Sequence, residues 1–159
     1  MIMADLAELE SEIRVLKDIE AIKRLKYRYC RCIDTKLWDE LSGCFSEDAS
    51  AYYYEPKWEF HGAEAIVQWL QEVDGRESMS GVHQVHHPEI AITGDTTATG
   101  VWALHSYSIE RAVNQAFRFD GYYHDEYVKE EGVWRIRTTR ASYVIRETWD
   151  RAPRLSTQY

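Results

Sequence analysis

Three histidines stand close together in the stretch GVHQVHHPEI, residues 81–90, which otherwise alternates like a β-strand. Successive side chains of a strand point to opposite faces, so His83 and His87 share one face and His86 lies on the other. A zinc site would need a third ligand from elsewhere, and Glu89 lies beyond a proline that ends regular strand pairing. The alternatives are a catalytic base, because imidazole has the side-chain pKa nearest neutrality, and polar residues on an exposed edge.

Asp34 is a second candidate, and it stands between the apolar Ile33 and the segment TKLWDEL. An aspartate in this place can cap the helix that follows, because its carboxylate accepts hydrogen bonds from backbone N–H groups of the first turn. Alternatively, a partly buried carboxylate beside a histidine fixes the tautomer of the ring and stabilises its cation. The local sequence leaves both interpretations open, since it does not show whether Asp34 and His83 meet.

Tyrosines could supply hydrogen bonds to a bound molecule. Tyr29 lies in KYRYC and Tyr53 in AYYYEP. Most such rings pack with the hydroxyl at the rim, but a phenol in a pocket can donate to a ketone oxygen as negative charge develops there. In TGVWALHSYSIE, alternation places Trp102 and Ser106 on one face, in a pocket or in the core. The candidates for substrate contact are Ser106, Trp102, His87 and Tyr143.

The spacing of apolar residues predicts helices in the first half of the chain, at about residues 6–16, 18–33, 35–43 and 62–73. Asp18 is expected to cap the second of them. The first helix carries an apolar stripe and could serve as an arm or as a helix that faces a partner. The stripe consists of Leu6, Leu9, Ile13 and Leu16.

Beyond Val73 the apolar residues alternate and are rich in Val, Ile, Thr, Tyr and Trp, which is typical of strands. The strands are expected at about residues 48–54, 58–61, 81–93, 96–111, 116–130 and 132–147. Helices followed by such a sheet predict an α+β fold, a cone-shaped curved antiparallel β-sheet (half-barrel) closed by N-terminal helices, whose mouth could hold a small molecule. The expected organisation is a helical arm (1–17), one domain (18–150) and a C-terminal tail (151–159).

The composition excludes some classes of partner. The 159 residues include 19 Lys and Arg against 27 Asp and Glu, a formal charge of −8, which repels phosphate backbones and argues against nucleic acid. No apolar run approaches the ~20 residues that cross a bilayer, and MIMADLAELE lacks the order of a signal peptide, so we expect no membrane partner and a cytoplasmic location. Cys30, Cys32 and Cys44 are expected to be buried thiols, without zinc-ligand spacing.

Four stretches together resemble a known family: KDIEAIKRLKYRYCRCIDTKLWDE, VHQVHHPEI, TATGVWAL and YHDEYVKEEGVWRI. In order and spacing they resemble the bile-acid 7-alpha-dehydratases of the SnoaL-like branch of the nuclear transport factor 2-like superfamily. The chain is more distantly similar to scytalone dehydratase and to hexachlorocyclohexane dehydrochlorinase. The resemblance covers about residues 13 to 153 and implies a cone of bent antiparallel sheet closed by three helices. It says little about the substrate, because the superfamily hosts many activities.

The resemblance also implies roles for individual residues. In those dehydratases an aspartate at the end of the long helix pairs with a histidine on the strand after the third helix, and these positions match Asp34 and His83. Tyrosines that contact the substrate oxygen match Tyr29 and, within one residue, Tyr53. The bile-acid enzymes carry an acidic residue where this chain has Ser106, so the resemblance supports neither bile acid itself nor a second carboxylate at that position.

The activity that the resemblance implies is that of a cofactor-independent dehydratase, a lyase that eliminates water from a hydrophobic cyclic ketone or a steroid-like or polyketide-like compound. His83 would take the acidic proton, and the carbonyl would be the electron sink, so neither a metal nor an organic cofactor is expected. The alternatives are an isomerase or cyclase, which could use the same base, and a non-catalytic module that binds a small ligand. The expected partners are a small hydrophobic substrate and further copies of the chain, as a homotrimer or a dimer.

Overall fold

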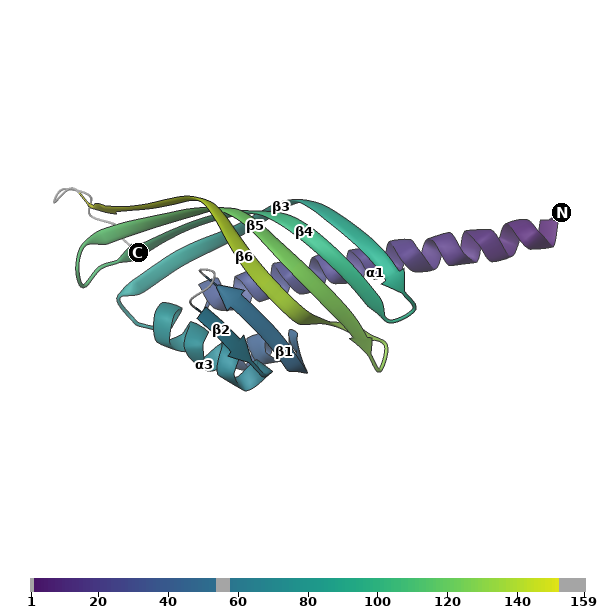
Figure 1. The fold of residues 1–159 in the computed structure, drawn as a ribbon, viewed down its shortest axis with the longest axis horizontal. Helices are drawn as coiled ribbons and strands as arrows, with labels where there is room; N and C mark the ends of the chain where they lie inside the picture. The colour runs from purple at the N-terminus through teal and green to yellow at the C-terminus, as the bar shows by residue number, and fades with distance from the viewer. Residues whose placement is uncertain (1, 54–57, 152–159) are drawn as a thin grey trace.

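The computed structural model describes residues 2–53 and 58–151, and it shows helices packed against one curved sheet (Figure 1). The described helices are α1 (Ile2–Asp34), α2 (Trp38–Ser42) and α3 (Ala63–Asp74). The described strands are β1 (Phe45–Tyr53), β2 (Trp58–His61), β3 (Met79–Gly94), β4 (Thr97–Glu110), β5 (Gln115–Glu130) and β6 (Val133–Asp150). The predicted α+β fold class is confirmed. The tail at residues 152–159 lies outside the described residues.

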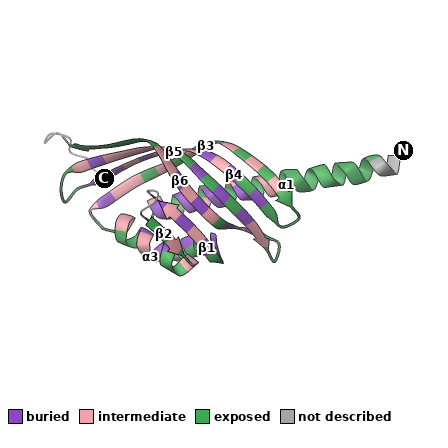
Figure 2. Cartoon of the chain, in the orientation of Figure 1, coloured by how far each residue is buried: buried purple, intermediate pink, exposed green. Residues whose placement is uncertain are grey.

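Helix α1 is one continuous helix, so the predicted start of a second helix at Asp18 is wrong. The Asp18 carboxylate caps nothing. It accepts a hydrogen bond from Trp134 Nε1 at 2.9 Å and lies 2.6 Å from Lys129 Nζ. A local sequence pattern assigns this carboxylate to a helix cap, but it binds Trp134 and Lys129, which lie more than a hundred residues further along the chain. The first half of α1 projects beyond the sheet, and its side chains from Asp5 to Lys17 are all exposed (Figures 1 and 2).

The six described strands form one sheet in the order β2-β1-β6-β5-β4-β3. All neighbours are antiparallel except β1 and β6, which run parallel, with Ala51 opposite Thr139. The sequence analysis predicted an antiparallel sheet and did not anticipate this parallel pair. Strands β1 and β6 are distant in sequence, so no hairpin turn fixes their relative direction.

The sheet bends because its register is interrupted. In β3 the pairing with β4 shifts between His86 and Glu89, and His87 has a positive φ of 47°. In β5 the pairing with β6 shifts at Gly121, where a Cβ atom would lie 2.0 Å from the Ser142 carbonyl oxygen. Such bulges bend a strand and increase its twist. The sheet curves over α3 and the second half of α1, and the concave side encloses the core (Figure 1).

The core is rich in aromatic side chains and lies between the sheet, the second half of α1 and α3. Figure 2 shows buried positions alternating along the central strands, as expected for a sheet with one covered face. The three cysteines are buried and free, as predicted. Among the described residues, no helix has both the length and the apolar character needed to cross a membrane.

Candidate active site

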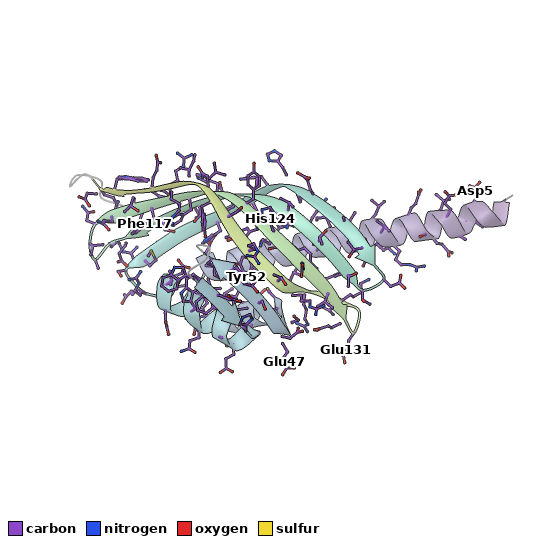
Figure 3. The ribbon with its side chains drawn as sticks, viewed as in Figure 1. Asp5, Glu47, Tyr52, Phe117, His124 and Glu131 are labelled. Atoms are coloured by element: carbon purple, nitrogen blue, oxygen red, sulfur yellow. The ribbon has the colours of Figure 1, made fainter. Side chains whose placement is uncertain are left out.

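A cavity of about 210 Å³ lies between α1, α3 and the concave face of the sheet. Most of its wall is aromatic or aliphatic, including Trp69, Leu104 and Phe117, which is labelled on β5 in Figure 3. Among the polar groups of the wall are Tyr29, Tyr53, Asp74, His83 and Ser106. An apolar pocket with a few convergent polar groups is the usual form of a small-molecule site.

The structure brings Asp34 and His83 together, from the end of α1 and the start of β3. His83 Nδ1 lies 2.8 Å from Asp34 Oδ1, and the backbone N–H of His83 donates to both carboxylate oxygens, at 3.1 and 3.0 Å. Because a carboxylate only accepts, Nδ1 must carry the proton and Nε2 is left able to take one. Helix α2 follows Leu37 and has no side-chain cap, so Asp34 does not serve as the helix cap that its position allowed.

This pairing changes the basicity of the histidine. Burial alone would lower the pKa of His83, because it disfavours the cation. The hydrogen bond and charge of Asp34, together with the charge of Asp74, outweigh burial and raise the pKa of His83 above its ordinary value. The side chains of His83 and Asp34 are only 15% and 19% exposed. The pair therefore provides a strengthened, oriented base at the cavity wall.

Two phenols meet on another part of the wall. The hydroxyl oxygens of Tyr29 and Tyr53 lie 3.0 Å apart, and both residues are buried. Burial raises the pKa of both side chains above the ordinary range, so both remain protonated donors at physiological pH. One hydroxyl donates to the other, and the hydroxyl that accepts keeps its own proton to donate. Tyr53 is held by stacking on Trp69, with ring centroids 4.8 Å apart.

A buried charge pair underlies this tyrosine cluster. Lys26 Nζ lies 2.8 Å from Asp125 Oδ2, and both side chains are fully buried. The same ammonium lies 3.6 Å from the ring centroid of Tyr123 and 4.5 Å from that of Tyr29, both of which line the cavity. Asp125 also accepts hydrogen bonds from Thr139 and Tyr127, at 2.7 Å each. This network fixes the rings that form the cavity wall.

The structure separates the predicted substrate-contact residues into two groups. Ser106 is buried on the cavity wall, and Tyr143 also lines the cavity. Trp102 faces the same side of β4 but lies outside the lining, in the core, where Nε1 donates to Tyr127 at 2.8 Å. His87 is exposed at the β3 bulge, outside the lining, because the bulge interrupts the alternation that placed it beside His83. Trp102 and His87 are therefore not among the residues that line this cavity.

Asp74 and Lys26 are among the polar residues of the site that the sequence analysis did not predict. Asp74, the last residue of α3, lines the cavity, and Lys26 supports its wall. Asp74 precedes a glycine and resembles an ordinary helix end, so its sequence carried no signal. Lys26 did carry one, because it interrupts the apolar stripe between Ile22 and Tyr29. Within the described residues, no group of three or more histidine, cysteine or acidic side chains could hold a metal ion.

Comparison with known proteins identifies the family. A SnoaL-like domain profile matches residues 14–140, so the chain belongs to the SnoaL-like family, as the sequence resemblance indicated. A candidate scytalone dehydratase from Novosphingobium aromaticivorans is similar in structure, with 22% identity, a TM-score of 0.77 and coverage of 87% of this chain and 91% of that one. The hexachlorocyclohexane dehydrochlorinase LinA-type3 from Novosphingobium barchaimii has 16% identity, a TM-score of 0.79 and coverage of 89% and 99%. At these identities the likeness establishes the shared fold.

Proposed function

We propose that the protein is a cofactor-independent lyase that eliminates water, or another leaving group, from the carbon β to the carbonyl of a hydrophobic cyclic ketone. The observation that carries the proposal is the 2.8 Å contact of His83 Nδ1 with Asp34 at the wall of a cavity that two buried phenols share. Structural similarity to a dehydrochlorinase and to a candidate dehydratase supports the same class of reaction.

The first step is removal of the acidic proton next to the carbonyl. His83 Nε2 accepts this proton, and Asp34 stabilises the imidazolium that forms, because its carboxylate is hydrogen-bonded to Nδ1. The electron pair moves towards the carbonyl oxygen. A hydroxyl of the Tyr29 and Tyr53 pair donates a hydrogen bond to that oxygen as charge grows on it.

The second step is loss of the leaving group. The enolate electron pair forms the carbon–carbon double bond while the bond to the leaving group breaks. A halide or carboxylate leaves as a stable anion, whereas a hydroxyl must receive a proton to leave as water. His83 carries a proton at this stage and is one possible donor.

The cavity limits the size of the substrate. Its volume of about 210 Å³ is below the ~300–1,000 Å³ of typical ligand pockets. Its aromatic lining suits a flat apolar ring system. We propose a substrate of one or two rings within the enclosed part, with any larger portion extending through the mouth.

A panel of cyclic β-hydroxy ketones tests the proposal, and ultraviolet absorbance measures the formation of the enone. The wild-type chain should accelerate elimination, and His83→Ala should abolish the acceleration. A double bond that moves without loss of a leaving group would instead establish an isomerase. Binding without any reaction, unchanged in His83→Ala, would establish a binding module and contradict the lyase.

We also propose that the chain is a homo-oligomer, a trimer as the resemblance implies, joined through the first half of α1. Leu6, Leu9, Ile13 and Leu16 are separated by three, four and three residues, the spacing of a coiled-coil seam, and each is about half exposed or more. An isolated helical segment of this length is marginal in water. Contact with the same segment of another copy would bury the seam.

A further inference from the structure

A carboxyl group other than that of Asp34 also lies at the cavity. Asp74 ends α3, is half-buried, and lines the cavity together with His83 and Ser106. A smaller recess beside the cavity is also bounded by Asp34, Asp74 and His83. Asp74 is therefore next to the proposed base but comes from a different element.

The side chain of Asp74 is not used by the fold. Within residues 2–53 and 58–151 its carboxyl group makes no hydrogen bond and no ion pair. The two nearby cations are engaged elsewhere: Arg76 lies 3.3 Å from Glu110, and Lys36 Nζ donates to the carbonyl oxygens of Arg76 and Met79, at 2.6 and 3.1 Å. A half-buried carboxyl group without a partner is unfavourable for folding, and such groups concentrate at sites that bind or react.

Burial favours the protonated form of Asp74, whereas three of the four charged groups around it oppose that form. Burial raises the pKa of Asp74, and the carboxylate of Asp34 on α1 raises it further. His83 on β3, and Arg76 and Lys36 in the loops, lower it, but the net pKa is above the ordinary value of 3.8. In return, the charge of Asp74 helps to raise the pKa of His83. The two groups form an acid and a base that are electrostatically coupled across the site.

We propose that Asp74 is a second acid–base residue of this site, which hydrogen-bonds the hydroxyl of a β-hydroxy ketone and gives it the proton it needs to leave. The inference rests on the proposed lyase function and narrows its substrate class to β-hydroxy ketones, whose hydroxyl group needs a proton to leave.

The step balances without any further reagent. The carbon–hydrogen bond breaks and its proton goes to His83 Nε2, while its electron pair forms the double bond. The carbon–oxygen bond breaks, and the oxygen takes the proton of Asp74 and departs as water. The proton on His83 then returns to Asp74 through solvent, which restores both groups.

Two matched probes test the inference. 3-Hydroxy-1-tetralone loses water and 3-acetoxy-1-tetralone loses acetic acid, and both give 1-naphthol, which is fluorescent. Acetate leaves as an anion and needs no acid. General acid catalysis contributes typically ~10²–10⁴-fold, so Asp74→Asn should lower kcat on the hydroxy ketone at least ~100-fold and leave the rate on the acetate nearly unchanged. Glu72→Gln, an exposed carboxyl group on the same helix, is the matched control and should behave as wild type on both.

A measurement without turnover checks the coupling. In Asp74→Asn the pKa of His83, followed by NMR of its ring proton, should fall, because Asp74 raises this pKa whenever its carboxyl group is ionised. In Glu72→Gln it should not move.

Failure of the Asp74 inference and failure of the proposed lyase function would give different results. Equal losses on both probes would overturn the role of Asp74 and leave the lyase standing, whereas an unchanged pKa of His83 in Asp74→Asn would overturn only the electrostatic coupling. Undiminished turnover by His83→Ala, or absence of turnover of both probes by the wild type, would overturn the proposed function and the inference with it.

Discussion

The chemistry of the site depends on how one carboxylate changes one imidazole. Asp34 accepts three hydrogen bonds from His83, two from the backbone N–H and one from the ring. These bonds set the ring orientation and the tautomer at once. They also raise the pKa of His83 against the opposing effect of burial, so the ring is a stronger base than an exposed histidine.

Asp34→Asn should therefore change the pH dependence of activity as well as its size. The base form of His83 exists above its pKa, so the acidic limb of the profile of kcat/KM against pH reports this pKa. Removing the negative partner lowers the pKa, and the limb should move to lower pH while the plateau falls. The measurement is a pH series on 3-hydroxy-1-tetralone for both chains. A limb that stays in place would show that Asp34 does not set the basicity of His83.

The same pair makes a contribution to stability with a defined sign. Because the folded pKa of His83 is raised, protonation of His83 stabilises the folded state fully below its unfolded value of 6.5. This contribution is lost as the pH rises through the folded pKa. The stability difference between wild type and Asp34→Asn should accordingly be largest at mildly acidic pH.

At the scale of single residues, the sequence predicted some members of the candidate site and missed others. Asp34 and His83 were identified through the resemblance, because both occupy marked positions in stretches that match the family. Asp74 could not be identified, because its importance comes from where α3 ends relative to β3, which no local pattern shows. Trp102 was assigned correctly to a face of β4, but alternation gives the face and not the distance along the cone.

At the scale of elements, α1 both supports the site and joins it to the core. Lys26 on this helix forms a buried ion pair with Asp125 on β5 and touches the rings of Tyr29 and Tyr123. The pair links the long helix to the centre of the sheet. A charge buried without its partner is strongly unfavourable, so each member of the pair depends on the other.

Lys26→Met should destabilise the fold by ~3–5 kcal/mol, because it leaves the Asp125 carboxylate buried without a cation. Urea denaturation gives the free energy of unfolding. The double variant Lys26→Met with Asp125→Asn should recover part of the loss, because no charge then remains. Lys23→Met, which removes a partly exposed lysine from the same helix, is the control and should be close to wild type in stability. A fully stable Lys26→Met chain would show that the pair does not hold α1 to the sheet.

The elements themselves were largely predictable, and the errors have a physical cause. The periods of apolar residues located all the described helices and strands to within a few residues. The false break at Asp18 arose because capping is a local preference, whereas Trp134 and Lys129 bind this carboxylate from the far end of the chain. The parallel pairing of β1 with β6 was missed because it is fixed by packing of the whole sheet.

At the scale of the whole molecule, the first half of α1 stands away from the domain. Asp5 marks its outer end in Figure 3, and the apolar side chains of its seam are exposed, with Leu16 at 61%. A single chain leaves this surface in water. Assembly through these helices would place several copies of the site around one axis.

Disruption of the seam should therefore change the mass of the particle. Light scattering after size exclusion should give a multiple of 18.7 kDa for the wild-type chain. The variant Leu9→Glu with Leu16→Glu should give a smaller particle, because charges cannot be buried in the seam. Ser11→Glu, on another side of the same exposed segment, should leave the mass unchanged. A wild-type chain of 18.7 kDa at micromolar concentration would contradict the assembly.

The central claim is that His83 removes a proton next to a ketone, and hydrogen exchange tests it most directly. In deuterated water, NMR of 1-tetralone follows replacement of the protons next to its carbonyl, with no leaving group involved. We predict that the wild-type chain accelerates this exchange and that His83→Ala does not, while exchange by the Asp74→Asn variant continues. Equal exchange by His83→Ala and wild type would contradict the assignment of His83 as the base.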